Sequence, residues 1–438
     1  MSFASALDRF FGLQENHTSV SQEVAAGLTT FMAMCYLIFV IPSMLADAGM
    51  PREAVTGSVV LITTIVTLIM GLWAKYPVGV APGLGITAFF AYFVCGPGGF
   101  TWQAGLGAVL ISGIVFFLLT VTRIRQWIVN AVPMDLKLAI VVGIGCFISL
   151  IGLKNAGIVV ADKSTFVALG NLTKPEVLLS VACFFVTVAL MVLKVRGAML
   201  IGILATTAVG IALGITELPK GSWVSFKFPD ISPVFMQLDL RGALSHGLVS
   251  IIFTLTMVDL FDNMGVLIGL ARKCGFMNDK GEIKNLDRAF ITDSIGTMLS
   301  SVIGTTTSTS YLESASGVAA GGRTGLTAVV ISLCFFVSIL FIPLVSIVPN
   351  YATAPILIIV GALMMQEVVH IHFEKLEIAV PAFLTIVTMP FTFNIATGFG
   401  FGFVSYAIIH VLIGRWRQVT PFMYVIAACF VINFVMRA

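Results

Sequence analysis

Three acidic residues lie in stretches of the chain that otherwise lack charge. Asp259 and Asp262 belong to the run FTLTMVDLFDNMG at 253–265, and their i, i+3 spacing places them on one face of a helix. Glu313 follows the hydroxyl-rich run TTTSTS. A charge at the centre of a bilayer costs from about 2.5 to above 10 kcal/mol, so such residues usually face a protein interior and are functional. We therefore expect the three carboxylates to converge on one cavity.

These acids are suited to carry a proton. No Lys or Arg inside the apolar runs is an obvious counterion for them, and burial without a cation favours the neutral form of a carboxyl group. A carboxyl group can also accept hydrogen bonds from the N–H groups of a ligand. The alternative is that Asp259, Asp262 or Glu313 only satisfies nearby helix ends or hydroxyl groups.

The composition indicates that the elements around these acids are membrane-spanning helices. Of 438 residues, 58% are hydrophobic and 10% are charged, against roughly 25% charged residues in a soluble domain. Long apolar runs recur along the whole chain, and at about 1.5 Å per residue most can cross a hydrocarbon layer of about 30 Å. The sequence therefore predicts an all-α polytopic membrane protein that is surrounded by lipid.

The apolar runs predict fourteen spans, and an apolar tail at 420–436 either spans as well or lies flat. The predicted spans are 21–45, 55–74, 79–95, 102–122, 133–152, 176–193, 197–215, 243–271, 288–304, 308–321, 324–348, 351–366, 376–394 and 395–413.

Basic residues gather in every second connection between the spans. By the positive-inside rule these connections face the cytoplasm, which predicts a cytoplasmic N-terminus and an external loop at 216–242. That loop, with Pro219, Pro229 and Pro233, divides the chain into two halves of seven spans, so the second half is inverted. The basic residues are Lys75, Arg123, Arg125, Lys194, Arg196, Arg272, Lys273, Lys280, Lys284, Arg323, Lys375, Arg415 and Arg417.

The third and tenth spans differ from the others. The segments APGLGITAFFAYFV (81–94) and GTTTSTSYLESASGVAAGG (304–322) are short and rich in Gly or hydroxyl residues. Interrupted segments at corresponding places in two halves indicate the binding site of a transporter. Backbone at membrane depth must be hydrogen-bonded or line a cavity. We therefore expect an extended stretch and a half-helix in each span, able to bind a planar molecule with donors and acceptors on its rim.

Three runs in the chain resemble the AzgA-like purine permeases of the nucleobase/ascorbate transporters, also named nucleobase:cation symporter 2. They are EVAAGLTTFMAMCYLIFVIPSML (23–45), DLFDNMG (259–265) and YLESASGVAAGGRTGLTAVV (311–330). The resemblance implies fourteen spans in two inverted repeats, with a core domain and a gate domain. It also implies proton-coupled uptake of a purine nucleobase such as adenine, hypoxanthine or guanine through the inner or plasma membrane by alternating access, and a homodimer.

The resemblance divides the chain into a series of regions, in which each domain is made of two separate segments. A cytoplasmic N-terminus (1–20) precedes the first core-domain segment (21–122) and the first gate-domain segment (133–215). After an external loop (216–242) come the second core-domain segment (243–348), the second gate-domain segment (351–413) and a C-terminal tail (414–438).

The resemblance also assigns roles to single residues. Asp262 and Glu313 are expected to bind the base, and Asp262, Asp259 and Glu313 to carry the proton. Many relatives have Asn in the third-span pattern G-x-N-A-F-F, where this chain has Thr87, whose hydroxyl is shorter and lacks the two-sided grip of an amide. The remaining substrate-binding candidates are Thr87 itself, Ala88, Phe89, Ser310 and Tyr311.

Other functional classes fit the sequence less well. An anion transporter of the same fold would be penalised by the nearby carboxylates. An enzyme would need a nucleophile with a base or a metal cluster, and no such motif is present. A passive channel is disfavoured by the inverted repeat and the broken spans. We expect no cofactor other than the coupling proton, no bound metal and no nucleic-acid partner.

Overall fold

The computed structural model describes residues 3–122, 124–217, 224–244, 246–276 and 283–437. Arg123, Pro219 and Lys280, which entered the predictions of topology, lie outside these ranges.

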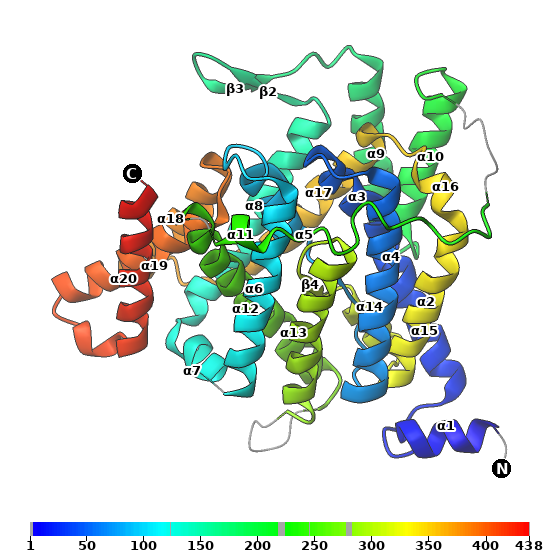
Figure 1. Cartoon of the computed structure of the whole chain (residues 1–438), viewed down its shortest axis with the longest axis horizontal. Coiled ribbons are helices and arrows are strands. Elements are labelled where there is room, and N and C mark those ends of the chain that lie inside the picture. Colours follow the sequence, from blue (N-terminus) through cyan, green and yellow to red (C-terminus); the bar gives the residue numbers. More distant parts are fainter. Residues whose placement is uncertain (1–2, 123, 218–223, 245, 277–282, 438) are drawn as a thin grey trace.

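The first half of the chain consists mainly of helices (Figure 1). Its elements are α1 (Phe3–Phe11), α2 (Val20–Met34), α3 (Leu37–Asp47), α4 (Arg52–Ile69), η1 (Met70–Ala74), β1 (Val80–Pro82), α5 (Leu84–Phe89), η2 (Phe90–Val94), α6 (Trp102–Val121), α7 (Ile124–Ala131), α8 (Met134–Asn155), β2 (Val159–Asp162), β3 (Phe166–Leu169), α9 (Pro175–Val192) and α10 (Ala198–Ala212).

The second half repeats the pattern of long helices with one short strand. Its elements are α11 (Leu240–Ala243), α12 (His246–Lys273), α13 (Leu286–Ile303), β4 (Ser308–Ser310), α14 (Ser314–Ala319), α15 (Gly325–Ser338), η3 (Ile339–Phe341), α16 (Ile342–Val345), α17 (Asn350–Met364), η4 (Met365–His370), α18 (Leu376–Phe391), α19 (Ile395–Leu412), η5 (Trp416–Gln418) and α20 (Pro421–Arg437).

The helices have the lengths that a membrane requires. Within the described residues, nine helices are long and apolar enough to cross a bilayer, and four more are apolar but shorter. Each of the fourteen predicted spans overlaps at least one of the observed helices. The predicted tenth span contains only a short helix, because its first residues form the strand β4. The predicted ninth span corresponds to α13, which carries acids and hydroxyl groups along its length and is not counted among these apolar helices.

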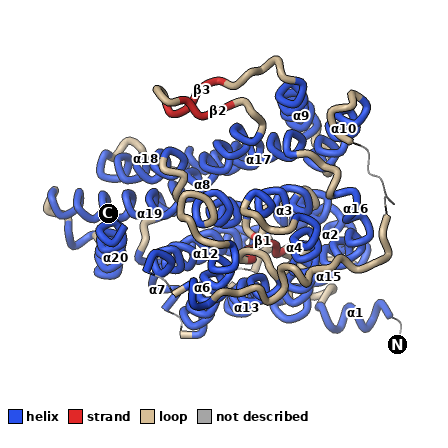
Figure 2. Tube along the Cα trace, turned by 45° about the horizontal axis from the view of Figure 1, so that its top comes forward, coloured by secondary structure: helices blue, strands red, loops and turns tan. Residues whose placement is uncertain are grey.

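The predicted interruptions of the third and tenth spans are confirmed. Each begins with a three-residue strand and continues as a short helix, β1 before α5 and β4 before α14. The strands pair antiparallel with each other, in the register Val80↔Ser310, Ala81↔Thr309 and Pro82↔Ser308. Figure 2 shows β1 enclosed by helices near the middle of the molecule. Segments more than 200 residues apart in sequence thus meet at the centre.

The helices pack mainly within two groups. The first, called the core group here, comprises α2–α6 and α12–α15, with contacts such as α6–α13, α2–α15 and α4–α15. The second, the gate group, comprises α8–α10 and α17–α19, with α8 packed on α17 and α18. Small residues permit this close approach, as where Gly145 faces the backbone of Gly361. The residue boundaries of the two predicted domains remain a prediction.

The structure has two local features that the sequence did not predict. The first predicted span is interrupted at Cys35 and Tyr36, where Ile38 and Phe39 donate to carbonyls three residues back. Further along, α3 contains Pro42, which has no N–H group for the carbonyl of Ile38. The connection after α8 forms the hairpin β2–β3, which projects beyond the helix ends (Figure 2).

Substitution of Gly325 tests the packing of α15 on η1. An alanine Cβ at Gly325 would collide with the carbonyl oxygen of Gly71 and lie 2.9 Å from Lys75 Cα, and both neighbours are backbone. We expect Gly325→Ala to lower stability by about 1–3 kcal/mol, seen as a lower melting temperature of the purified protein. Gly269→Ala is the matched control, because its Cβ meets nothing within 4 Å. Equal melting temperatures for both variants would contradict the packing described.

Candidate functional site

The site is built around the paired strands β1 and β4. At one end of the pair Gly83 N–H donates to Thr307 O at 2.9 Å, and at the other Tyr311 N–H donates to Gly79 O at 3.0 Å. The edge of β1 is satisfied by Thr67 on α4, whose hydroxyl accepts from Val80 N–H at 2.9 Å and donates to Val80 O at 3.0 Å. Backbone that would be costly at membrane depth is therefore paired.

The opposite edge, on β4, is held by α12. Asn263 Oδ1 accepts from Ser310 N–H at 2.8 Å, and Asn263 Nδ2 donates to Asp259 Oδ1 at 3.0 Å. The other oxygen of Asp259 accepts from the hydroxyl of Thr297 at 3.1 Å. Asp259 is fully buried. Its carboxylate therefore orients the amide that holds the strand, which matches the alternative that it satisfies neighbouring polar groups.

Asp262 and Glu313 form the second acidic set, and both side chains are partly exposed. Their carboxyl groups lie close enough to interact electrostatically. Glu313 Oε1 accepts a hydrogen bond of 2.6 Å from the hydroxyl of Tyr36. Within the described ranges of the chain, Asp262 makes no side-chain hydrogen bond. Asp262 therefore has free acceptor oxygens beside a second carboxyl group.

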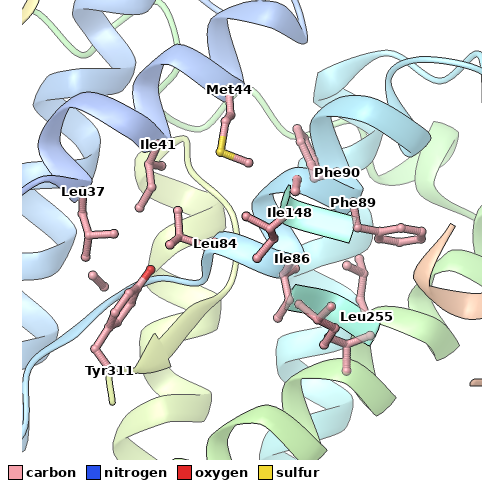
Figure 3. Packing of buried hydrophobic residues seen from close by; sticks show 14 of the residues in the cluster. Leu37, Ile41, Met44, Leu84, Ile86, Phe89, Phe90, Ile148, Leu255 and Tyr311 are labelled. Atoms are coloured by element: carbon pink, nitrogen blue, oxygen red, sulfur yellow. The ribbon is translucent and has the colours of Figure 1, made fainter. Parts of the chain in front are cut away.

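The candidates on α5 divide into two sets. Thr87 is fully buried, and its hydroxyl oxygen lies 2.6 Å from that of Thr306, so it ties α5 to the segment before β4. Ala88 and Phe89 are also fully buried, and Phe89 stacks on Phe93 at 5.2 Å between ring centroids. Phe89 and Tyr311 lie apart, with Leu84 and Ile86 between them (Figure 3). In this conformation the ring of Phe89 therefore contacts Phe93.

Ser310 and Tyr311 are both engaged within the protein. Ser310 Oγ donates to Asp293 Oδ1 at 3.1 Å. The hydroxyl of Tyr311 donates to the carbonyl of Pro82, and Figure 3 shows this ring reaching toward the segment before Leu84. Because the Tyr311 N–H is bonded to Gly79, it is not available to a ligand in this conformation.

The expectation that the acids lack a neighbouring cation is wrong for Asp259. Arg125, which the positive-inside rule assigned to a cytoplasmic connection, is only 2% exposed, and its guanidinium interacts electrostatically with Asp293 and Asp259. Arg125 lies in the interior because α7, the helix that carries it, folds against α6 and α12.

Sequence reasoning missed Tyr36, Asn263 and Asp293. Asp293 could have been found, because it is an acid inside the predicted span 288–304 and the rule that drew attention to Asp259 applies equally to it. Asn263 and Tyr36 carry no such signal, because neutral polar side chains are common in membrane helices. Only the tertiary contacts show that they bind Ser310 and Glu313.

The run after Glu313 has a structural role. Glu23 on α2 is fully buried and accepts hydrogen bonds from Arg323 N–H at 2.8 Å and from both the N–H and the hydroxyl of Thr327. Arg323 in turn donates to the carbonyls of Val318 and Gly322. These bonds satisfy the groups exposed between α14 and the start of α15. Among the described residues, no group of His, Cys, Asp and Glu side chains is placed to hold a metal ion.

Comparison with known proteins identifies the family of the chain. Residues 21–401 match the model of a permease family. The chain belongs to this family. It is 42% identical to the adenine permease AdeQ of Escherichia coli over 433 residues, which are 99% of this chain and 97% of that one. It is 40% identical to the guanine/hypoxanthine permease PbuO of Bacillus subtilis, covering 97% of this chain and 99% of that one.

Membership of the family confirms the resemblance to the nucleobase/ascorbate transporters and identifies the chain as an integral membrane transporter, not an enzyme. A solved structure adds support for the fold. The transmembrane domain of the cyanobacterial bicarbonate transporter BicA superposes with a TM-score of 0.65 at 15% identity, over 85% of this chain and 95% of that one. The predicted inverted repeats of seven spans are thereby confirmed.

Replacement of Tyr36 tests the acidic pair. Tyr36→Phe removes the donor to Glu313 and leaves this partly exposed carboxyl group without that partner, at a cost of about 1–3 kcal/mol. We expect transport by this permease to fall about fivefold or more at subsaturating substrate. Tyr76→Phe is the matched control, because the buried Tyr76 hydroxyl donates to Lys284 O away from the site. A similar loss of transport in both variants would show that the Tyr36 contact has no special role.

Proposed function

We propose that the protein is a proton-coupled symporter of a purine nucleobase that works by alternating access. The observation that carries the proposal is the acidic pair Asp262 and Glu313, partly exposed beside the paired strands β1 and β4. The adenine and guanine/hypoxanthine permeases at 40% identity or more support the choice of cargo.

The acids would bind the N–H groups of the base. The oxygens of Asp262 accept no hydrogen bond from the described residues, and Glu313 keeps acceptor capacity beyond its bond to Tyr36. Acceptor atoms of the base need donors, and the Thr87–Thr306 pair can supply one: one hydroxyl donates within the pair, and the other keeps its hydrogen. The buried hydroxyls of Thr305 and Thr307 have no hydrogen-bond partner among the described residues and lie on the same segment. The hydroxyl groups here therefore serve where relatives with Asn at the position of Thr87 use an amide.

The proton would act through Asp262. A proton that enters from outside neutralises one carboxylate of the pair and reduces the repulsion between the two groups when the base is bound. Release of that proton on the cytoplasmic side restores the negative charge and weakens the site for the next step. The membrane potential adds about 2.3 kcal/mol per charge per 100 mV to inward movement of the proton. No other cofactor is required by this cycle.

An anion as cargo fits this site poorly. The two acids that face each other would repel it, and Arg125 lies with Asp259 and Asp293, not with Asp262 and Glu313. The similarity to the bicarbonate transporter therefore concerns the fold only.

Uptake of radiolabelled purine bases into proteoliposomes under an imposed pH gradient tests the proposal. We expect one base to accumulate, Glu313→Gln to lower uptake about tenfold or more because it loses a charged acceptor, and Asp262→Asn to abolish dependence on the gradient. Glu377→Gln is the control, because that acid pairs with Arg415 at the surface. Equal entry with and without the gradient would contradict proton coupling, and unchanged uptake by Glu313→Gln would contradict the site.

A polar latch joins the core and gate groups at the helix ends predicted to face outside. Ser43 Oγ on α3 donates to Asn350 Oδ1 on α17 at 2.7 Å. Asn155 Nδ2 on α8 donates to the hydroxyl of Tyr92 at 2.8 Å, which donates to Asp47 Oδ2 at 2.6 Å. These residues, other than Ser43, line a cavity of about 780 Å³. Alternating access requires such contacts to break, so we propose that the latch closes the outer side.

Labelling of Cys95, which lines this cavity, tests the latch. Asn350→Ala removes the acceptor of Ser43, so the outer side should open more often. We expect a membrane-impermeant maleimide to label Cys95 about three- to tenfold faster, as for the loss of one hydrogen bond. Asn171→Ala, in an exposed turn, is the control, and Cys95→Ser identifies the labelled site. An unchanged rate would show that these bonds do not limit opening.

The remaining predictions about the whole protein belong to the same proposal. The positive-inside rule supports a cytoplasmic N-terminus. The resemblance to the purine permeases supports insertion in the inner or plasma membrane. The resemblance to the purine permeases supports a homodimer.

A further inference from the structure

A buried arginine occupies the connection between the two helix groups. Arg125 lies on α7, which links α6 of the core group to α8 of the gate group. Its guanidinium carbon is 3.6 Å from the ring centroid of Phe290 on α13 and 4.4 Å from that of Phe116 on α6. None of its three side-chain nitrogens has a hydrogen-bond partner among the described residues. A buried cation without hydrogen bonds is costly, so a compensating charge is expected nearby.

Two acids supply that charge. Asp293 lies three residues after Phe290 and shares its face of α13, and Asp259 lies on α12. Both interact electrostatically with Arg125, and no ion pair within 4.0 Å joins them in the described ranges. Asp262 interacts with both acids from α12. One arginine thus faces two acids at a distance longer than direct contact.

Both acids hold the same residue of β4. Asp293 accepts from the hydroxyl of Ser310, and Asp259 orients Asn263, which accepts from the N–H of Ser310. Glu313 lies three residues beyond Ser310, so the placement of this strand also sets the placement of the substrate-binding acid. Any group that holds the two acids in place therefore acts on the binding site without contact to the substrate.

We propose that Arg125 is a positioning residue that supplies the countercharge for Asp259 and Asp293 and thereby fixes Ser310 and strand β4. This role rests on the proposed function of the same site. Because α7 joins the core group to the gate group, movement between the groups also changes how closely the countercharge approaches the acids. The cation therefore links the position of the gate to the shape of the binding site.

A double-mutant cycle tests the charge interaction. The variants are Arg125→Gln, Asp293→Asn and the double variant, with Arg125→Lys as the conservative change. Purine binding is measured by calorimetry on the full-length protein in detergent. We expect Arg125→Gln to weaken binding about tenfold and Arg125→Lys less than about threefold. In the double variant, binding should be weakened little more than by Asp293→Asn alone. Its dissociation constant should therefore differ about fivefold or more from the value expected if the two single effects multiplied.

The surface pair Arg415 and Glu377 provides the matched control. The corresponding cycle, Arg415→Gln with Glu377→Gln, should leave purine binding unchanged. The proposal is overturned if Arg125→Lys weakens binding as much as Arg125→Gln, or if the effects of Arg125→Gln and Asp293→Asn multiply. Either result would mean that shape or packing matters at Arg125, and not its charge.

Melting temperatures of the same variants separate this proposal from the proposed function. Coupling between Arg125 and Asp293 should appear in thermal stability without any ligand. If the parent protein binds no purine base, the proposed function fails. The melting temperatures of the same variants still test the role of Arg125, and additive changes in melting temperature would overturn that role. If Arg125→Gln alone yields no folded protein, recovery of folding in the double variant supports the pair, and equal failure of Arg125→Lys overturns it.

Discussion

The antiparallel contact of β1 and β4 is the constraint on which the rest of the site depends. Two short pieces of extended backbone lie deep in a protein that is surrounded by lipid, where an unpaired N–H or C=O group is costly. They satisfy each other along the shared edge, and Thr67 and Asn263 satisfy groups on the outer edges. Because each strand comes from a different half of the chain, neither half can form the site alone.

This arrangement separates the four acids near the paired strands into two sets with different contacts. Asp259 and Asp293 face Arg125 and hold Asn263 and Ser310, so they define the shape of β4. The second set, Asp262 and Glu313, is partly exposed and remains open to a ligand and a proton. In the proposed cycle, a proton therefore changes the charge of Asp262 and Glu313 without breaking the contacts that keep the strands in place. Asp259 of the first set and Asp262 of the second lie three residues apart on α12, so the same helix carries one acid of each set.

The sequence predicted much of the fold and some of the site. Composition and length were sufficient for the spans, and the clusters of Gly and hydroxyl residues identified the two broken ones. Asn263 and Thr297 both donate hydrogen bonds to Asp259, and the spacing of the acids in the sequence does not reveal these partners. Phe89 was a candidate for stacking on a ligand, yet it packs on Phe93. An aromatic residue next to a broken helix can face either the cavity or the neighbouring helix, and spacing alone does not distinguish these.

What the sequence determined by itself follows from local physical chemistry. Apolar length fixes insertion in a membrane, interrupted helices mark a cavity, and an acid in an apolar run requires a buried polar environment. The tertiary structure alone decided which polar groups meet. Tyr36 is 277 residues from Glu313 in sequence, and Arg125 entered the interior because of how α7 folds against α6 and α12. Such partners are selected by the packing of whole helices, and no local pattern in the chain records that packing.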